Sequence, residues 1–169
     1  APIAAALRAG ADIVVTGRCA DSALTLAACM AHFGWDAHDW DRLAAGSLAG
    51  HLIECGPPAT GGNFPDWRQA GDPAQIGHPV GEVAADAPLA LTRPEDTTGI
   101  VIPASVGEQM LYEIGDPRAY LLPDVTCDFS GVEIVQDGAD RVRVTGARGR
   151  PPNGRLKVSL TYRDGWRGG

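Results

Sequence analysis

The sequence predicts an α/β fold, in which an open, mostly parallel sheet portion is followed by a mainly antiparallel, β-rich portion. Two observations support this prediction. Residues 2–32 follow the order helix, strand, loop, helix, which is typical of a doubly wound sheet. After residue 79, short apolar runs alternate with turn residues, which indicates hairpins. We therefore divide the single domain or domain fragment 1–169 into a parallel α/β part (1–58), a long loop (59–78) and a mainly antiparallel α+β part (79–169).

The parallel part begins with a predicted helix over residues 2–9. Gly10 ends this helix, because glycine adopts the left-handed cap conformation without steric cost. Residues 12–16, DIVVT, are almost continuously apolar after the first position, as a parallel strand covered on both faces requires. We therefore expect Val14 and Val15 to be buried.

Two further helices complete this part. Asp21 or Ser22 can cap a helix that extends to about residue 32, because both side chains accept hydrogen bonds from free backbone N–H groups. The next helix is predicted over about residues 41–55, and Gly56 followed by two prolines ends it.

The antiparallel part contains several strand-like runs and one helix. The Ser-x-x-Glu pattern of Ser105 and Glu108 is a capping box, which predicts a helix from Ser105 to about Ile114 with Ser105 as its N-cap. The predicted strands are 80–83, 89–92, 132–135, 141–145 and 156–162.

The last two of these strands predict a basic sheet face. Apolar and basic residues alternate with a period of two, so the apolar set points inward and the basic set outward. We expect Arg141, Arg143, Lys157 and Arg163 to share one side of an antiparallel pair. Such a face can bind an anion such as coenzyme A, meet an acidic surface, or protect an edge strand from aggregation.

Composition limits the possible classes of protein. The chain has 169 residues, 44% of them hydrophobic, and a net charge of −7, which argues against nucleic acid as a partner. The region 141–169 nevertheless holds eight of the 14 basic residues. No apolar run reaches the roughly 18 residues of a membrane span. We read no signal peptide in the first residues. None of the four cysteines forms a Cys-x-x-Cys pair, so we expect free thiols. We expect a cytoplasmic protein, and the single lysine suggests a GC-rich bacterial source.

Several long runs resemble the acyclic terpene utilisation protein A (AtuA-like) family, a family of largely uncharacterised function. They are GADIVVTGRCADSALTLA (10–27), LAAGSLAGHLIECG (43–56), TGGNFPDW (60–67), VGEQMLYEIGDPRAYLLPDV (106–125) and VTGARGRPPNGRLKVSLTYRDGW (144–166). The resemblance covers nearly the whole chain. It implies a central fragment of a longer protein and a place in citronellol and geraniol catabolism, where intermediates are coenzyme A thioesters. The family has no agreed set of catalytic residues to transfer.

The sharpest local pattern is His51, Glu54 and Cys55. Helical spacing of i, i+3 and i+4 puts these side chains on one face. The pattern is compatible with a Cys–His nucleophile and base, with a metal site, or with a buried histidine and a packed cysteine. Cys55 lies in the last predicted helical turn, where the helix dipole raises the pKa of a thiol. We therefore assign possible catalytic roles to His51 and Glu54 and no metal site.

A second candidate lies in the turn that follows residues 12–16. Ligands of open α/β sheets bind at the carboxyl ends of the strands, so Arg18 there can hold a carboxylate or phosphate. Asp21 is either a third catalytic residue or a helix cap. Neither the Gly-x-Gly-x-x-Gly nor the Walker pattern occurs, so no nucleotide-binding fingerprint is present and the cofactor is unknown.

The long loop supplies the third candidate. Successive N–H groups of a glycine pair can form an anion nest, although two glycines also permit a tight turn. On the first interpretation, the substrate-binding residues are Thr60, Gly61, Gly62 and Asn63 together with Arg18. We predict that these residues, Asp21 and His51 meet in one site.

Two classes of function fit these observations. The first is an enzyme that acts on a branched acyl-CoA thioester or small carboxylic acid, bound as an anion. The second is a non-catalytic binding or accessory subunit of a catabolic enzyme complex. The sequence leaves open whether the chain is an enzyme, and we expect the full-length protein to form a homo-oligomer.

Overall fold

The computed structural model describes residues 2–155, 158 and 160–166. Within them, helices and short strands are mixed along the chain. The α-helices are α1 (Pro2–Arg8), α2 (Ala23–Phe33), α3 (Trp40–Glu54) and α4 (Pro103–Leu111), and three 3-10 helices are η1 (Pro57–Thr60), η2 (Trp67–Ala70) and η3 (Pro73–Gln75). The strands are β1 (Val80–Val83), β2 (Leu89–Thr92), β3 (Tyr120–Leu121), β4 (Thr126–Asp128), β5 (Glu133–Gln136), β6 (Val142–Thr145) and β7 (Arg148–Arg150).

The first three helices confirm the predicted helical segments to within one or two residues. Gly10 has a φ of 88°, and its N–H donates to the carbonyl of Leu7, as expected of a residue that ends a helix. Gly56 follows α3 with a φ of 74°. By contrast, the Ser22 side chain makes no capping hydrogen bond at the start of α2, where the Ala23 N–H donates to the Ala20 carbonyl.

The strands form two antiparallel sheets, with orders β1-β2-β6-β5 and β3-β4-β7. The β1–β2 hairpin confirms the predicted pair, with Val80 opposite Thr92 and Val83 opposite Leu89. The prediction of a mostly parallel sheet portion is wrong, because every paired strand in the described residues is antiparallel to its neighbours. A single isolated bridge between Ile76 and Thr98 is parallel.

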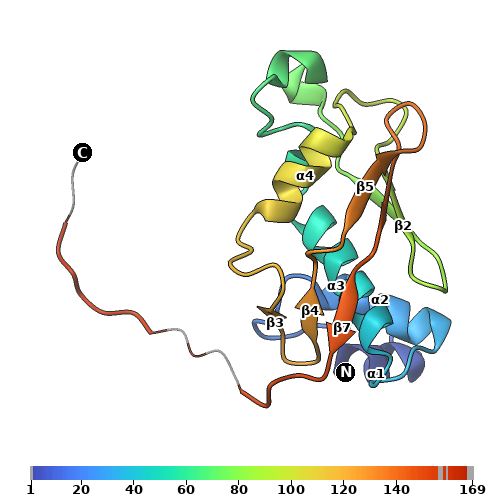
Figure 1. The fold of residues 1–169 in the computed structure, drawn as a ribbon, viewed down its shortest axis with the longest axis vertical. Coiled ribbons are helices and arrows are strands. Elements are labelled where there is room, and N and C mark those ends of the chain that lie inside the picture. Colours follow the sequence, from blue (N-terminus) through green and yellow to red (C-terminus); the bar gives the residue numbers. More distant parts are fainter. Residues whose placement is uncertain (1, 156–157, 159, 167–169) are drawn as a thin grey trace.

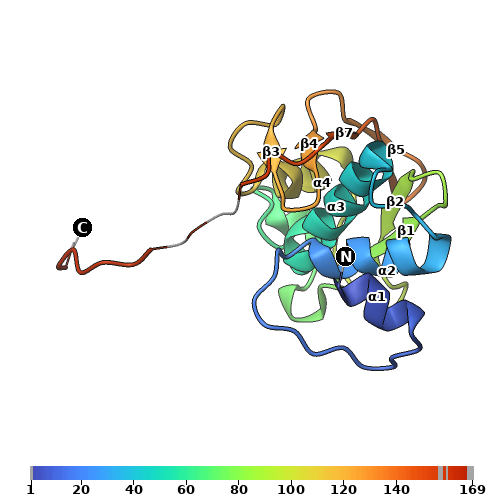
Figure 2. The same ribbon diagram turned by 90° about the horizontal axis from the view of Figure 1, so that it is seen from below.

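Residues 12–16 account for this error. They are extended but pair with no strand of the described chain, and the side chains of Ile13 and Val15 are 84% and 91% exposed. A parallel strand needs neighbouring strands and helices on both faces, and here α1 packs directly on α2 instead. Figure 2 shows the segment as a wide loop along the outside of the molecule between these two helices.

Helix α4 starts earlier than the capping box predicted. Pro103 occupies the first helical position, which suits a residue whose φ is fixed and whose missing N–H has no intrahelical partner. Ser105 is therefore the third helical residue, and its hydroxyl accepts from the Ile102 N–H at 3.2 Å and lies 3.2 Å from the Ala59 carbonyl, to which it can donate. The predicted N-cap role of Ser105 is wrong.

The predicted basic strand pair is also wrong. Strand β6 lies between β2 and β5, so both of its edges are already paired. The alternation along β6 itself is confirmed, because Val142 and Val144 are buried and Arg143 is exposed. Within 156–162, residues 156, 157 and 159 lie outside the described residues, and the described ones are exposed and form no strand.

One hydrophobic core holds both sheets and the helices together. Helix α3 runs through the middle of the molecule and packs against α2, α4, β1, β4 and β7 (Figures 1 and 2). Its glycines permit this close packing: a Cβ on Gly46 would lie 2.9 Å from Leu26, and one on Gly50 would lie 2.6 Å from the Ser22 Cα. Among the described residues, no helix is long and apolar enough to cross a membrane.

Candidate functional site

A pocket of about 290 Å³ lies between α1, α2 and the 16–20 segment, and we call it the Arg18 pocket. Leu26 and Met30 of α2 are buried beneath it, at 4% exposure each. Arg18, itself exposed, lines the opening. The remaining lining residues are Pro2, Ile3, Thr16, Gly17, Cys19, Ala20, Ala23, Ala27, Pro123 and Asp124. The pocket therefore combines apolar walls with a guanidinium group.

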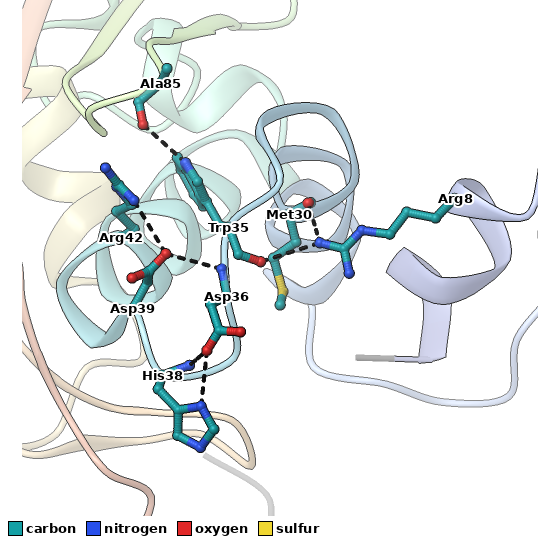
Figure 3. A network of polar contacts seen from close by, with 8 residues as sticks. All are labelled: Arg8, Met30, Trp35, Asp36, His38, Asp39, Arg42 and Ala85. Carbon is teal, nitrogen blue, oxygen red and sulfur yellow. Dashed lines mark hydrogen bonds and ion pairs between the residues drawn. The ribbon is translucent and has the colours of Figure 1, made fainter.

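Two contacts fix the walls of the Arg18 pocket. The Arg8 guanidinium at the end of α1 donates to the carbonyls of Met30 and Trp35, at 2.5 and 3.2 Å, and so ties α1 to the end of α2 (Figure 3). On the other side, the backbone of Ser22 lies directly against Gly50 of α3. The residue that follows the Gly17–Asp21 turn thus packs against α3, the helix that carries His51.

His51 is only 5% exposed and lies beside Tyr120 of β3. Its Nε2 is 3.3 Å from the Met110 carbonyl, its own carbonyl accepts from Gln109 Nε2 at 2.9 Å, and its ring centroid is 6.1 Å from that of Tyr120. These are the contacts of a buried histidine that joins α3 to α4 and β3. Asp21 and His51 do not line the Arg18 pocket.

Tyr120 has an unusual electrostatic environment. Burial raises the pKa of its hydroxyl, and the side chains of Cys127, Asp21, Glu113 and Glu54 raise it further. The carboxylates of Asp21 and Glu54 thus contribute to the raised pKa of the phenol that lies beside His51. Sequence reasoning missed Tyr120, because nothing in the run YLLP distinguishes a functional tyrosine from a core one.

Cys55 lines a different pocket, of about 310 Å³, together with Pro58, Asn63, Glu108, Gln109 and Tyr112. The Cys55 thiol donates to Glu54 Oε1 at 2.7 Å. Burial and this hydrogen bond raise the pKa of the thiol. A protonated thiol is a poor nucleophile, and the His51 ring contacts the Met110 carbonyl rather than the thiol, so the geometry does not support a Cys–His pair.

The 60–63 loop is held by internal hydrogen bonds. The Thr60 side chain is fully buried and donates to the carbonyl of Gly77 at 2.6 Å. The N–H groups of Gly61 and Gly62 donate to the carbonyls of Pro58 and Pro57. These groups have partners already, which favours the tight-turn interpretation over an anion nest. Of this loop, Asn63 lines the pocket beside Cys55.

The structure thus divides the predicted single site. The backbone of Ser22, just after the Arg18 turn, lies against Gly50 of α3, whereas Asn63 of the 60–63 loop lines a different pocket beside Cys55, at the same end of α3. Among the described residues, no three His, Cys, Asp or Glu side chains gather closely enough to hold a metal ion.

Comparison with known proteins gives one informative match. The model of the family described as "Acyclic terpene utilisation family protein AtuA" matches residues 1–169, the whole chain. A search of curated proteins found no match. A search of solved structures also found none. Because the family model covers every residue, the chain belongs to the acyclic terpene utilisation (AtuA) family.

Proposed function

We propose that the chain binds a branched-chain acid, or the coenzyme A thioester of one, in the Arg18 pocket. The pocket is the observation that carries this proposal. Its walls are the apolar side chains of α1 and α2, and its volume of about 290 Å³ exceeds the roughly 150 Å³ that encloses benzene. A branched hydrocarbon chain fits such walls, because its burial removes apolar surface from water.

Arg18 supplies the complementary charge. A guanidinium can hold a carboxylate or phosphate through two parallel hydrogen bonds, and these charge-assisted bonds are stronger than neutral ones. The ligand is then oriented with its anionic group at the 16–20 segment and its chain against Leu26 and Met30. Membership of a family named for acyclic terpene utilisation supports a branched substrate of this kind.

Replacing Arg18 with alanine is expected to weaken binding of citronellic acid and of its coenzyme A thioester about tenfold, because the exposed ion pair is lost while the apolar walls remain. Isothermal titration calorimetry on the full chain measures this change. Arg143→Ala is the matched control, since Arg143 is exposed on β6 and outside the pocket. Equal losses in both variants would contradict the proposed site.

A second candidate function is acid–base chemistry on the bound compound, with His51, Asp21 and Glu54 as the predicted catalytic residues. It is supported by the proximity of the His51 and Tyr120 rings, whose centroids are 6.1 Å apart, and by the negative charges that raise the pKa of Tyr120. β3, which carries Tyr120, is followed by Pro123 and Asp124 of the Arg18 pocket. We propose that His51 transfers a proton and that Tyr120 positions it, with the two carboxylates setting the charge of this region.

Tyr120→Phe is expected to slow exchange of the α-protons of citronellyl-CoA about tenfold, because the variant removes the hydroxyl and keeps the ring that packs beside His51. Proton NMR in heavy water follows the exchange. Tyr112→Phe serves as control, since Tyr112 lies by the other pocket. If Tyr120→Phe exchanges as fast as the unmodified chain, Tyr120 has no positioning role.

The alternative of a non-catalytic accessory subunit is supported by the exposed apolar side chains of Ile13 and Val15. An extended segment with such side chains suits pairing with another chain, and the expected homo-oligomer is one form of such pairing. Calorimetric titration separates an accessory subunit from a ligand-binding protein, because an accessory subunit is expected to bind neither citronellic acid nor its coenzyme A thioester.

A further inference from the structure

A second cavity, which we call the Asp86 cavity, lies between the first half of α3, the β1–β2 turn and the β6–β7 segment, on the side of α3 that faces the four-stranded sheet. Its volume is about 180 Å³. The floor consists of Leu48, Leu89 and Val144, each no more than 3% exposed, and the last two are cross-strand partners. A cavity slightly larger than one that holds benzene has room for a hydrocarbon group of a few carbons.

Charges of both signs stand at the rim of this cavity. Arg148 Nη1 contacts Asp41 at 3.1 Å, and Arg42 Nη1 contacts Asp39 at 3.2 Å. Each of these pairs uses one end of a guanidinium that carries five N–H donors, so both arginines can bond a further acceptor. Asp86, also at the rim, has no ion-pair partner in the described part of the chain.

The turn that carries Asp86 is held by a hydrogen bond from Trp35 and has a strained backbone. The Trp35 indole N–H donates to the Ala85 carbonyl at 2.9 Å, and Figure 3 shows this bond beside the Arg42–Asp39 pair. Ala87 has a φ of 83°, a left-handed conformation that strains a residue with a Cβ. Such strain persists where the surroundings fix the backbone, and it occurs often at ligand sites.

We propose that the Asp86 cavity binds a small apolar α-amino acid as its zwitterion. The carboxylate bonds to Arg42 and Arg148, the ammonium group to Asp86, and the side chain covers Leu48, Leu89 and Val144. A simple carboxylate would leave Asp86 without a counter-charge. A simple amine would leave the remaining N–H donors of the two guanidinium groups unused. The proposal does not depend on the Arg18 pocket, which shares no lining residue with this cavity.

Calorimetric titration of the full chain with L-leucine, isocaproate and isoamylamine tests this proposal, because the last two probes each lack one charged group of leucine. Leucine is expected to bind at least fivefold more tightly than either analogue. Asp86→Asn is expected to weaken leucine binding about fivefold, the size of a partly exposed ion pair.

Asp96→Asn is the matched control, since Asp96 is exposed and outside the cavity, and it is expected to leave leucine binding unchanged. The proposal is overturned by isocaproate binding as tightly as leucine, by an unchanged affinity in Asp86→Asn, or by the absence of leucine binding at millimolar concentration. Citronellic acid titrated into Asp86→Asn is expected to bind as it does to the unmodified chain, which keeps this test independent of the Arg18 pocket.

Discussion

Trp35→Ala is expected to lower the free energy of unfolding by about 4 kcal/mol, because truncation of a fully buried indole removes apolar contacts and leaves a cavity. Trp35 is only 2% exposed and stacks on Phe33, with ring centroids 5.5 Å apart. It also lies against Gly46 of α3, where an added Cβ would be 3.0 Å from the indole ring. Urea unfolding followed by circular dichroism measures the loss.

Two further variants separate the contributions to this effect. Trp35→Phe keeps most of the ring but removes the N–H that donates to Ala85, so it is expected to cost about 1–3 kcal/mol, part of it from the unpaired carbonyl. Trp67→Ala is the control, since Trp67 is 46% exposed, and a loss below about 1 kcal/mol is expected. Similar losses for Trp35→Ala and Trp67→Ala would mean that Trp35 is not part of the core.

Gly50→Ala is expected to destabilise the fold by about 2 kcal/mol. The new Cβ would lie 2.6 Å from the Cα of Ser22 and 2.7 Å from its carbonyl oxygen, and these backbone atoms can move only with the start of α2. The gain in helix propensity, up to about 1 kcal/mol, offsets part of the clash. Because the same movement shifts the Arg18 turn, the affinity for citronellic acid is expected to fall as well.

Gly107→Ala provides the opposite result in a matched substitution. Gly107 lies inside α4, and a Cβ there meets no atom within 4 Å. The variant is therefore expected to be more stable than the unmodified chain by up to about 1 kcal/mol. Thermal unfolding of both variants measures these effects. Crowding at Gly50 is expected to lower the melting temperature of Gly50→Ala while that of Gly107→Ala rises. A general effect of glycine replacement would shift both melting temperatures in the same direction.

Sequence-local signals determined several elements. Glycines at positions 10 and 56 ended α1 and α3 because each position needed a positive φ, and the short apolar runs separated by turn residues predicted the β1–β2 hairpin. The same local reasoning placed the N-cap of α4 three residues too late, at Ser105 instead of Ile102. Both Pro103 and Ser105 favour a helix start, and the proline signal was the stronger one.

The tertiary structure decided the remaining features, because they depend on partners distant in the sequence. Residues 12–16 have the composition of a buried parallel strand, yet a strand forms only where another strand offers its backbone groups, and none of the described strands does so here. The approach of Tyr120 to His51 likewise spans two segments almost seventy residues apart. Residue types identified Arg18 and His51 as candidates, whereas packing of α1 on α2 decided that Arg18 lines a pocket, and packing around α3 decided that His51 is buried.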